Sequence, residues 1–121
     1  MPLPNNRPLN VIRVHAYAAD QSSASSSFAT FPCRGRIVKL GVVNYAAVTT
    51  APNVLTAKIA GTAITHPTWT VTHSGAAAGD VVEVVPSAAN RGVEGQNIEF
   101  ISDGAGSGTV PCNYYADIVV D

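Results

Sequence analysis

Short runs of β-forming residues follow one another along this chain, and turn residues separate them. In residues 94–104, Ile98 and Phe100 fall on one side of such a run, and Glu99 and Ile101 fall on the other. A period of two residues is that of a strand with one buried face. Because no amphipathic helix interrupts the pattern, we expect the chain to fold as a small, rigid all-β body.

The turn-marked spacing predicts about eight strands in a single antiparallel β-sandwich of the jelly-roll or a related type. The expected strands are residues 11–18, 36–45, 54–60, 63–65, 69–72, 81–85, 97–102 and 112–120. In the second of these, Val38 and Val42 are expected to share one face with Leu40. Four large apolar residues are expected in the core: Leu40, Ile98, Phe100 and Ile118.

The N-terminal third of the chain has two segments that do not fit the strand pattern. Residues 1–10 contain three prolines and are expected to form an extended arm, outside a sandwich domain of residues 11–121. Residues 19–32 are rich in serine, which predicts a low-complexity loop too polar to form core. Phe28 and Phe31 are the exceptions, and we expect them to attach the end of this loop to the sandwich or to a partner.

The length and the low charge indicate one domain that shares its surface with neighbours. A chain of 121 residues buries enough apolar surface to fold without metal or disulfide support. Only 12% of its residues are charged, and small and β-branched residues dominate. The isolated protein is therefore expected to be a symmetric oligomer.

The net charge of −1 hides an uneven distribution. Residues 1–58 contain six basic residues and one acidic residue, Asp20. Residues 59–121 contain seven acidic residues and one basic residue, Arg91. Two interpretations remain open. Strands of opposite sign pair within one sheet so that the charges cancel, or the surface is bipolar and docks on an acidic scaffold or a second copy. No basic run carries interleaved aromatics, so nucleic acid is not an expected partner.

Targeting signals and cysteine usage predict where the protein is made. The residues after Met1 lack the apolar core of a signal peptide, and no run approaches the roughly 18 apolar residues of a membrane span. We therefore expect synthesis in a cytoplasm and no membrane partner. Cys33 and Cys112 are too few for a disulfide scaffold. Two buried thiols are favoured, and a disulfide is the alternative if the strand after Pro32 lies beside the last strand.

Residues with metal-binding chemistry are few and scattered. His66 and His73 lie seven residues apart, wider than the usual spacing of metal ligands, and Asp80 follows them. Asp80, Glu83 and Asp103 do not form the dense Asp-x-Asp pattern of a calcium site. We expect no metal and no cofactor.

Two glycine-rich patterns also fail to predict an active site. Ser107 lies between two glycines but not in the strand-to-helix turn of a nucleophile elbow. The glycine-rich residues 103–108 precede an expected strand, whereas a phosphate-binding loop precedes a helix. The protein is therefore not expected to be an enzyme.

Several of these segments occur in an order that suggests a family. They are residues 54–64 with a Gly-Thr turn, 69–72 with Trp-Thr-Val-Thr, 78–86 ending in proline, 93–104 with Glu-Gly-Gln and a closing Asp-Gly, and a last Val/Tyr-rich strand. This order resembles small β-domains of tailed-bacteriophage virions, notably capsid decoration (cement) proteins and head-fibre bases. The resemblance covers about residues 34–121, and residues 1–32 lie outside it.

The resemblance implies a structural protein on the outside of a bacteriophage capsid. Such a protein bridges neighbouring major-capsid subunits and stabilises the shell against internal DNA pressure through many weak contacts. It also implies closed symmetry, with a homotrimer favoured over a homodimer. The basic residues proposed to contact the capsid are Arg7, Arg13, Arg34, Arg36 and Lys39.

Two other functions remain as alternatives. A tail- or head-fibre module would bind host-surface glycan by stacking sugars on Trp69, Tyr114 or Tyr115. Against this, a core position for tryptophan and a cross-strand position for tyrosine are commoner. A small hydrolase is the more distant alternative.

Overall fold

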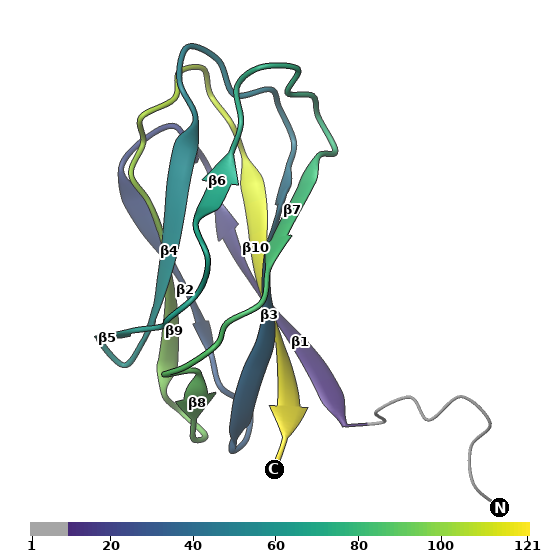
Figure 1. The fold of residues 1–121 in the computed structure, drawn as a ribbon, viewed down its shortest axis with the longest axis vertical. Coiled ribbons are helices and arrows are strands. Elements are labelled where there is room, and N and C mark those ends of the chain that lie inside the picture. The colour runs from purple at the N-terminus through teal and green to yellow at the C-terminus, as the bar shows by residue number, and fades with distance from the viewer. Residues whose placement is uncertain (1–9) are drawn as a thin grey trace, which may run out of the picture.

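The computed structural model describes residues 10–121, which form two antiparallel sheets packed face to face (Figure 1). The predicted antiparallel β-sandwich is therefore confirmed. The arm predicted for residues 1–10, with Arg7, lies outside the described residues apart from Asn10. The described strands are β1 (Val11–Ala18), β2 (Ser25–Thr30), β3 (Gly35–Asn44), β4 (Asn53–Ile59), β5 (Thr62–Ala63), β6 (Trp69–Val71), β7 (Val81–Val84), β8 (Arg91–Gly92), β9 (Asn97–Ser102) and β10 (Cys112–Val120).

The first sheet has the strand order β1-β10-β3-β7, and β8 also pairs with β3. The second sheet has the order β2-β9-β4-β5, and β6 also pairs with β4. Gly35 pairs with Val120 at the end drawn at the bottom of Figure 1, which we call the lower end. Asn44 pairs with Cys112 at the opposite, upper end.

The serine-rich segment corrects the sequence prediction. Residues 19–32 were expected to be a loop, but they contain β2, which pairs with β9 along its whole length. The side chains of Ser27 and Ala29 are buried, and Phe31 beyond the strand is 1% exposed. The small side chains of Ser27 and Ala29 pair with the bulky core residues Phe100 and Ile98 of β9. The segment is therefore a strand because β9 provides a hydrogen-bonding partner, although its own composition is that of a loop. Phe31 attaches to the sandwich as expected, whereas Phe28 is 59% exposed.

A β-bulge changes which residues of β3 face the core. Asp117 pairs with Lys39 and Ile118 pairs with Ile37, so Val38 has no partner on β10. Leu40 and Val42 are buried as predicted, but Ile37 takes the core position expected for Val38, which is only half-buried. The expected alternation is therefore wrong by one residue below the bulge.

The core between the sheets is centred on three aromatic side chains. Phe100 and Tyr114 stack with ring centroids 5.2 Å apart, and Trp69 packs edge-on against both. The Trp69 Nε1–H donates a hydrogen bond to the carbonyl of Val82 at 3.2 Å, so its polar group is satisfied. All four predicted core residues are 0% exposed: Leu40, Ile98, Phe100 and Ile118.

A buried polar cluster joins the two sheets near the upper end. The Gln21 side chain donates to Asn44 Oδ1 of the first sheet at 2.8 Å and accepts from Asn53 Nδ2 of the second sheet at 3.0 Å. Ser102 Oγ donates to the carbonyl of Gln21 at 2.6 Å. Among the described residues, every buried side-chain nitrogen and oxygen has a hydrogen-bond partner. The upper loops are therefore held in one arrangement by directional bonds.

The two cysteines lie at opposite ends of the sandwich. Cys112 begins β10 at the upper end, and Cys33 lies two residues before Gly35 at the lower end. The nine residues from Cys112 to Val120 span about 26 Å of strand, far beyond the reach of a disulfide. Both thiols are free, and Cys33 is half-buried rather than buried. Burial raises the pKa of the Cys112 thiol.

Candidate functional site

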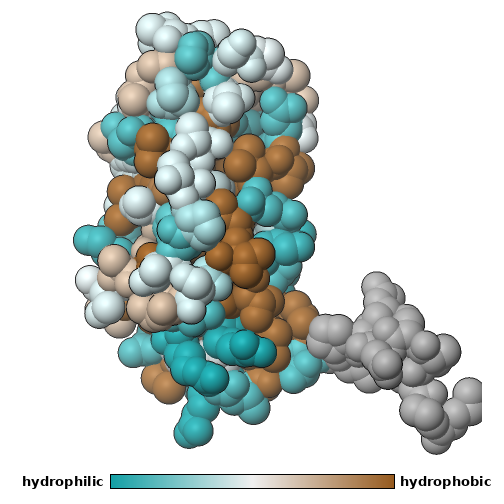
Figure 2. All heavy atoms as spheres, viewed as in Figure 1, coloured by the Kyte–Doolittle hydropathy of each residue, from teal (hydrophilic) through white to brown (hydrophobic). Residues whose placement is uncertain are grey.

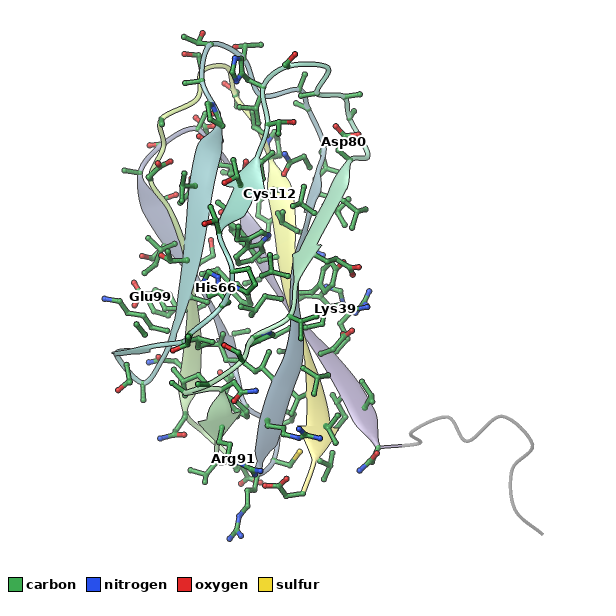
Figure 3. All side chains as sticks on the ribbon, viewed as in Figure 1. Lys39, His66, Asp80, Arg91, Glu99 and Cys112 are labelled. Carbon is green, nitrogen blue, oxygen red and sulfur yellow. The ribbon has the colours of Figure 1, made fainter. Side chains whose placement is uncertain are left out.

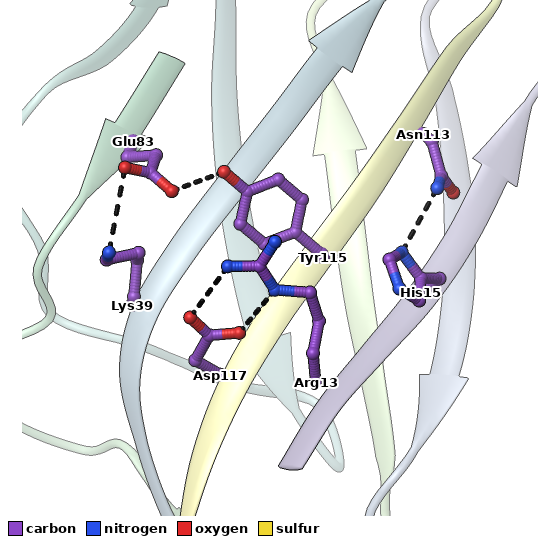
Figure 4. Close-up of polar contacts among 7 residues, drawn as sticks. All are labelled: Arg13, His15, Lys39, Glu83, Asn113, Tyr115 and Asp117. Carbon is purple, nitrogen blue, oxygen red and sulfur yellow. Dashed lines mark hydrogen bonds and ion pairs between the residues drawn. The ribbon is translucent and has the colours of Figure 1, made fainter. Parts of the chain in front are cut away.

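The outer face of the first sheet carries a polar network on four adjacent strands (Figure 4). Alternate residues of each strand point away from the core, and the register places the polar ones in two rows. One row contains His15, Tyr115, Gly41 and Glu83, and the next contains Arg13, Asp117 and Lys39. We call Arg13, Lys39, Glu83, Tyr115 and Asp117 the Tyr115 network.

Tyr115 lies flat across β3 because its neighbour on that strand is glycine. A Cβ atom built on Gly41 would collide with the tip of the Tyr115 ring. The ring crosses this position, and its hydroxyl donates a hydrogen bond to Glu83 on β7. Tyr115 is therefore only 3% exposed although it lies on the outer face. Burial, followed by the bond to Glu83, raises the pKa of Tyr115 above its ordinary value.

Arg13 covers the other side of this ring. Its guanidinium lies 4.0 Å from the Tyr115 ring centroid, and its Nε and Nη2 donate to the two oxygens of Asp117 at 2.6 and 3.0 Å. The bond to Asp117 raises the pKa of Arg13 further. Lys39 Nζ lies 3.7 Å from Glu83 Oε1. Stacking and paired hydrogen bonds thus fix Arg13 within the sheet, and Lys39 is held only by its ion pair with Glu83.

These ion pairs bear on the uneven charge of the sequence. Arg13–Asp117 and Lys39–Glu83 each join a basic residue of the first half to an acidic residue of the second half. Within the Tyr115 network the opposite charges cancel between neighbouring strands. Two of the five basic residues expected to contact a capsid therefore already have acidic partners within the sheet.

The lower end of the sandwich gathers three other arginines, and we call them the arginine end: Arg34, Arg36 and Arg91. Arg36 and Arg91 are direct partners in the pairing of β3 with β8. Arg34 and Arg91 line one shallow cavity of about 330 Å³. Figure 3 shows Arg91 at this end and Asp80 at the other. All three arginines are exposed.

The residues considered for catalysis or metal binding lie apart from one another, with Glu83 on β7 and the others in loops and turns. His66 packs edge-on against Trp69, and its Nδ1 is 2.7 Å from the carbonyl of Pro67. Asp80 accepts a hydrogen bond from the backbone N–H of Ala77 at 2.8 Å, and Ser107 forms an isolated β-bridge with Thr49. Within residues 10–121, no three His, Cys, Asp or Glu side chains are grouped to hold a metal ion, and no helix is long and apolar enough to cross a membrane.

Sequence reasoning missed the two residues that organise these surfaces. Gly41 was read only as part of a strand, and Arg91 only as a lone base in an acidic half. A glycine inside an otherwise β-branched strand signals close approach by a neighbouring group. That signal was available for Gly41, whereas the position of Arg91 beside Arg36 depends on a pairing across 55 residues.

The comparisons with known proteins identify a fold. No protein-family model matches the sequence, and no curated protein matches it. Among solved structures, the chain is similar to one described as the cyanophage Pam1 capsid asymmetric unit. The TM-score is 0.58 and the sequence identity is 11%, and the alignment covers 100% of this chain and 93% of that chain. The two chains share a fold over the whole of this chain and most of the other.

Proposed function

We propose that this protein is a non-enzymatic structural component of a bacteriophage virion and attaches to the capsid. The observation that carries the proposal is the fold shared, over the whole chain, with a chain of a cyanophage capsid. Because one fold hosts many functions, the fold supports the proposal only together with other evidence. The order of sequence motifs resembles that of virion decoration domains, and the low charge is suited to a protein with neighbours.

In the finer form of the proposal, the protein binds the outside of the shell and bridges major-capsid subunits as a homotrimer, with a dimer as the alternative. Exposed apolar residues support self-association. Tyr17, Val43 and Val81 occupy one register row on the outer face of the first sheet, and Tyr17 and Val81 are 65% and 54% exposed. Figure 2 shows hydrophobic residues running along the side of the molecule that carries β7. A neighbouring subunit would cover such a surface.

The alternative function, a fibre module that binds glycan, required exposed aromatic rings on which sugars could stack. Trp69 is 0% exposed and Tyr114 is 1% exposed, so both belong to the core. Tyr115 lies on the outer face, but Arg13 covers its ring. None of the three offers a free aromatic face for stacking a sugar, and they take the core and cross-strand positions that are commoner for these residues.

The direct test is whether the protein belongs to the particle. Virions of the source phage should contain the protein in a fixed ratio to the major capsid protein. Purified protein should also bind saturably to shells that have lost it after mild heat or salt treatment, and should raise the temperature at which those shells break. Absence of the protein from purified virions, together with no binding to shells, would exclude the proposal.

A further inference from the structure

The pairing of β3 with β8 places two like charges directly opposite each other. Arg36 and Arg91 are register partners, and side chains at opposed positions of an antiparallel pair point to the same face. Elsewhere the register sets opposite charges side by side, as in Arg13 with Asp117 and Lys58 with Glu99. Opposed like charges destabilise a sheet. The exception at the arginine end therefore needs a reason outside the stability of this fold.

The arginine end is also hollowed. The cavity of about 330 Å³ is lined by Arg34, Arg91, Gly92, Val93, Gln96 and Asp121. A second cavity of about 560 Å³ shares Arg91 and Gln96 and extends to Ile59 and Thr62. Arg91 and Gln96 thus stand between two adjoining hollows. An extended segment laid across them would pass a guanidinium, an amide and then an apolar side chain.

The charges of the arginine end are only partly neutralised within the chain. Arg91 Nη1 lies 3.0 Å from Asp121 Oδ2, and the Arg91 side chain remains 69% exposed. Among the ion pairs of residues 10–121, none involves Arg34 or Arg36. This lower end therefore offers free guanidinium groups to an anion, unlike the Tyr115 network.

Acidic residues at the upper end do not neutralise the arginines of the lower end, because their carboxylates accept backbone hydrogen bonds within the upper loops. Asp20 Oδ1 accepts from the backbone N–H groups of Ser22 and Val110, both at 3.0 Å. Asp103 Oδ1 accepts from Val54 N at 3.0 Å, and Asp80 accepts within its own turn. The two ends of the sandwich thus differ in sign, with carboxylates held at one end and guanidinium groups exposed at the other.

We propose that the arginine end binds an extended acidic peptide segment, which in the virion belongs to the major capsid protein. The identity of the partner rests on the proposed function, whereas the carboxylate chemistry rests on the site alone. Guanidinium groups bind carboxylates through paired hydrogen bonds. In the part of the chain that the structure describes, neither cavity is lined by an aromatic side chain on which a base could stack, which disfavours a single-stranded nucleic acid as the partner. A segment with a few carboxylates displaces Asp121 from Arg91 and relieves the repulsion between Arg91 and Arg36.

The test measures binding of a fluorescent poly-glutamate peptide to the full-length protein by anisotropy. The wild-type protein should bind, and binding should weaken as salt is added. Arg36→Gln should weaken binding about tenfold, since a charged hydrogen-bonded pair contributes on that order. A variant with Arg34, Arg36 and Arg91 all changed to Gln should show no binding. Lys58→Gln, which removes the same charge from the outer face of the second sheet, is the matched control and should bind as wild type does.

A stability measurement separates a lost site from a lost fold. Because Arg36→Gln removes the repulsion from Arg91, the variant should melt at the wild-type temperature or slightly above it while binding less peptide. Equal binding by wild type and the triple variant would overturn the proposal. So would failure of the wild type to bind poly-glutamate, or tighter binding to a short single-stranded oligonucleotide.

Shell binding by the same variants distinguishes this inference from the proposed function. If wild type and the triple variant bind shells equally, the arginine end is not the capsid contact and the proposed function stands. If neither binds shells but poly-glutamate binding still depends on the three arginines, the acidic-peptide site stands and the proposed function fails. If the wild type binds both shells and poly-glutamate and the triple variant binds neither, the result supports the acidic-peptide site and the proposed function.

Discussion

Arg13 and Arg36 both lie on the outer face of the first sheet, but their surroundings differ. Arg13 stacks on Tyr115 and forms two hydrogen bonds with Asp117, which is 8% exposed. Arg36 is exposed and lies opposite another arginine. One environment satisfies a charge within the fold, and the other leaves a charge unsatisfied.

This contrast separates charges that stabilise the sandwich from charges available to a partner. A guanidinium fixed by stacking and by a carboxylate has little capacity for a second anion. When an anion binds an exposed guanidinium beside a like charge, the repulsion between the two positive charges falls, which favours binding. The Tyr115 network should therefore respond to substitution in stability, and the arginine end should respond in binding.

The largest loss of stability is expected from a substitution in the core. Losses from the Tyr115 network and the arginine end should be smaller. Truncation of Phe100, which stacks on Tyr114 between the sheets, should lower the free energy of unfolding by about 3–5 kcal/mol. Phe100→Ala should therefore lose folding and shell binding together. Circular dichroism during thermal melting is the measurement. A cooperative melt at the wild-type temperature would show that the aromatic core is not what stabilises the fold.

A smaller loss is expected from filling the space that Gly41 leaves for Tyr115. Gly41→Ala places a methyl group where the ring now lies, and should lower the free energy of unfolding by about 1–3 kcal/mol. Denaturant unfolding measures the loss. In a Tyr115→Ala background the same glycine change should cost much less, since the colliding ring is gone. Equal costs in the two backgrounds would contradict the close approach, and poly-glutamate binding serves as the control that the arginine end is unaffected.

Alkaline pH should weaken the Tyr115 network. The pKa of Tyr115 is raised above the ordinary value of 10.0 in the folded state, so the folded protein holds this proton more tightly than the unfolded chain. The stabilisation is complete below about pH 10 and is lost as pH rises above it. The pKa values of Tyr114 and Cys112 are raised as well, so the wild-type loss has three sources.

The variant Tyr115→Phe isolates one of these sources. Its unfolding free energy should fall less steeply between neutral pH and about pH 11 than that of wild type. Urea denaturation at a series of pH values gives both slopes. Identical slopes would mean that Tyr115 titrates alike in the folded and unfolded states.

Arg13→Gln sharpens the comparison with Arg36 most directly. Loss of the paired bonds to Asp117 and of the stacking on Tyr115 should lower the free energy of unfolding by about 1 kcal/mol, because half of the Arg13 side chain is in solvent. Poly-glutamate binding should stay at the wild-type level. Reduced binding with unchanged stability would assign Arg13 to the contact surface and remove the distinction between the two regions.

The smallest effect on stability is expected from deleting residues 1–10. This proline-containing segment carries little core-forming surface, so the melting temperature should change little. We expect weaker attachment to shells, because Arg7 is lost with the segment. If the shortened protein binds shells as well as the full chain, the arm is not an anchor, and the remaining basic candidates are Arg34, Arg36 and Lys39.

Local alternation was enough to predict much of the sandwich. The observed bounds of β1, β9 and β10 agree with the predicted ones, and Ile98, Phe100 and Ile118 are fully buried as expected. These strands have a regular two-residue period and clear turn residues at their ends, so neighbouring residues in the sequence carry the information. The absence of a helical period was sufficient to predict the all-β class.

Long-range pairing decided the rest. A serine-rich segment became β2 because β9 lies beside it, and the extra residue at Val38 moved Ile37 into the core. The same kind of pairing laid Tyr115 over Gly41 and set Arg36 against Arg91. A strand's own residues determine which of them alternate, but the register between strands determines which side chains meet. The sequence alone therefore determined the sandwich and much of its core, whereas both candidate surfaces arose from contacts between residues far apart in the chain.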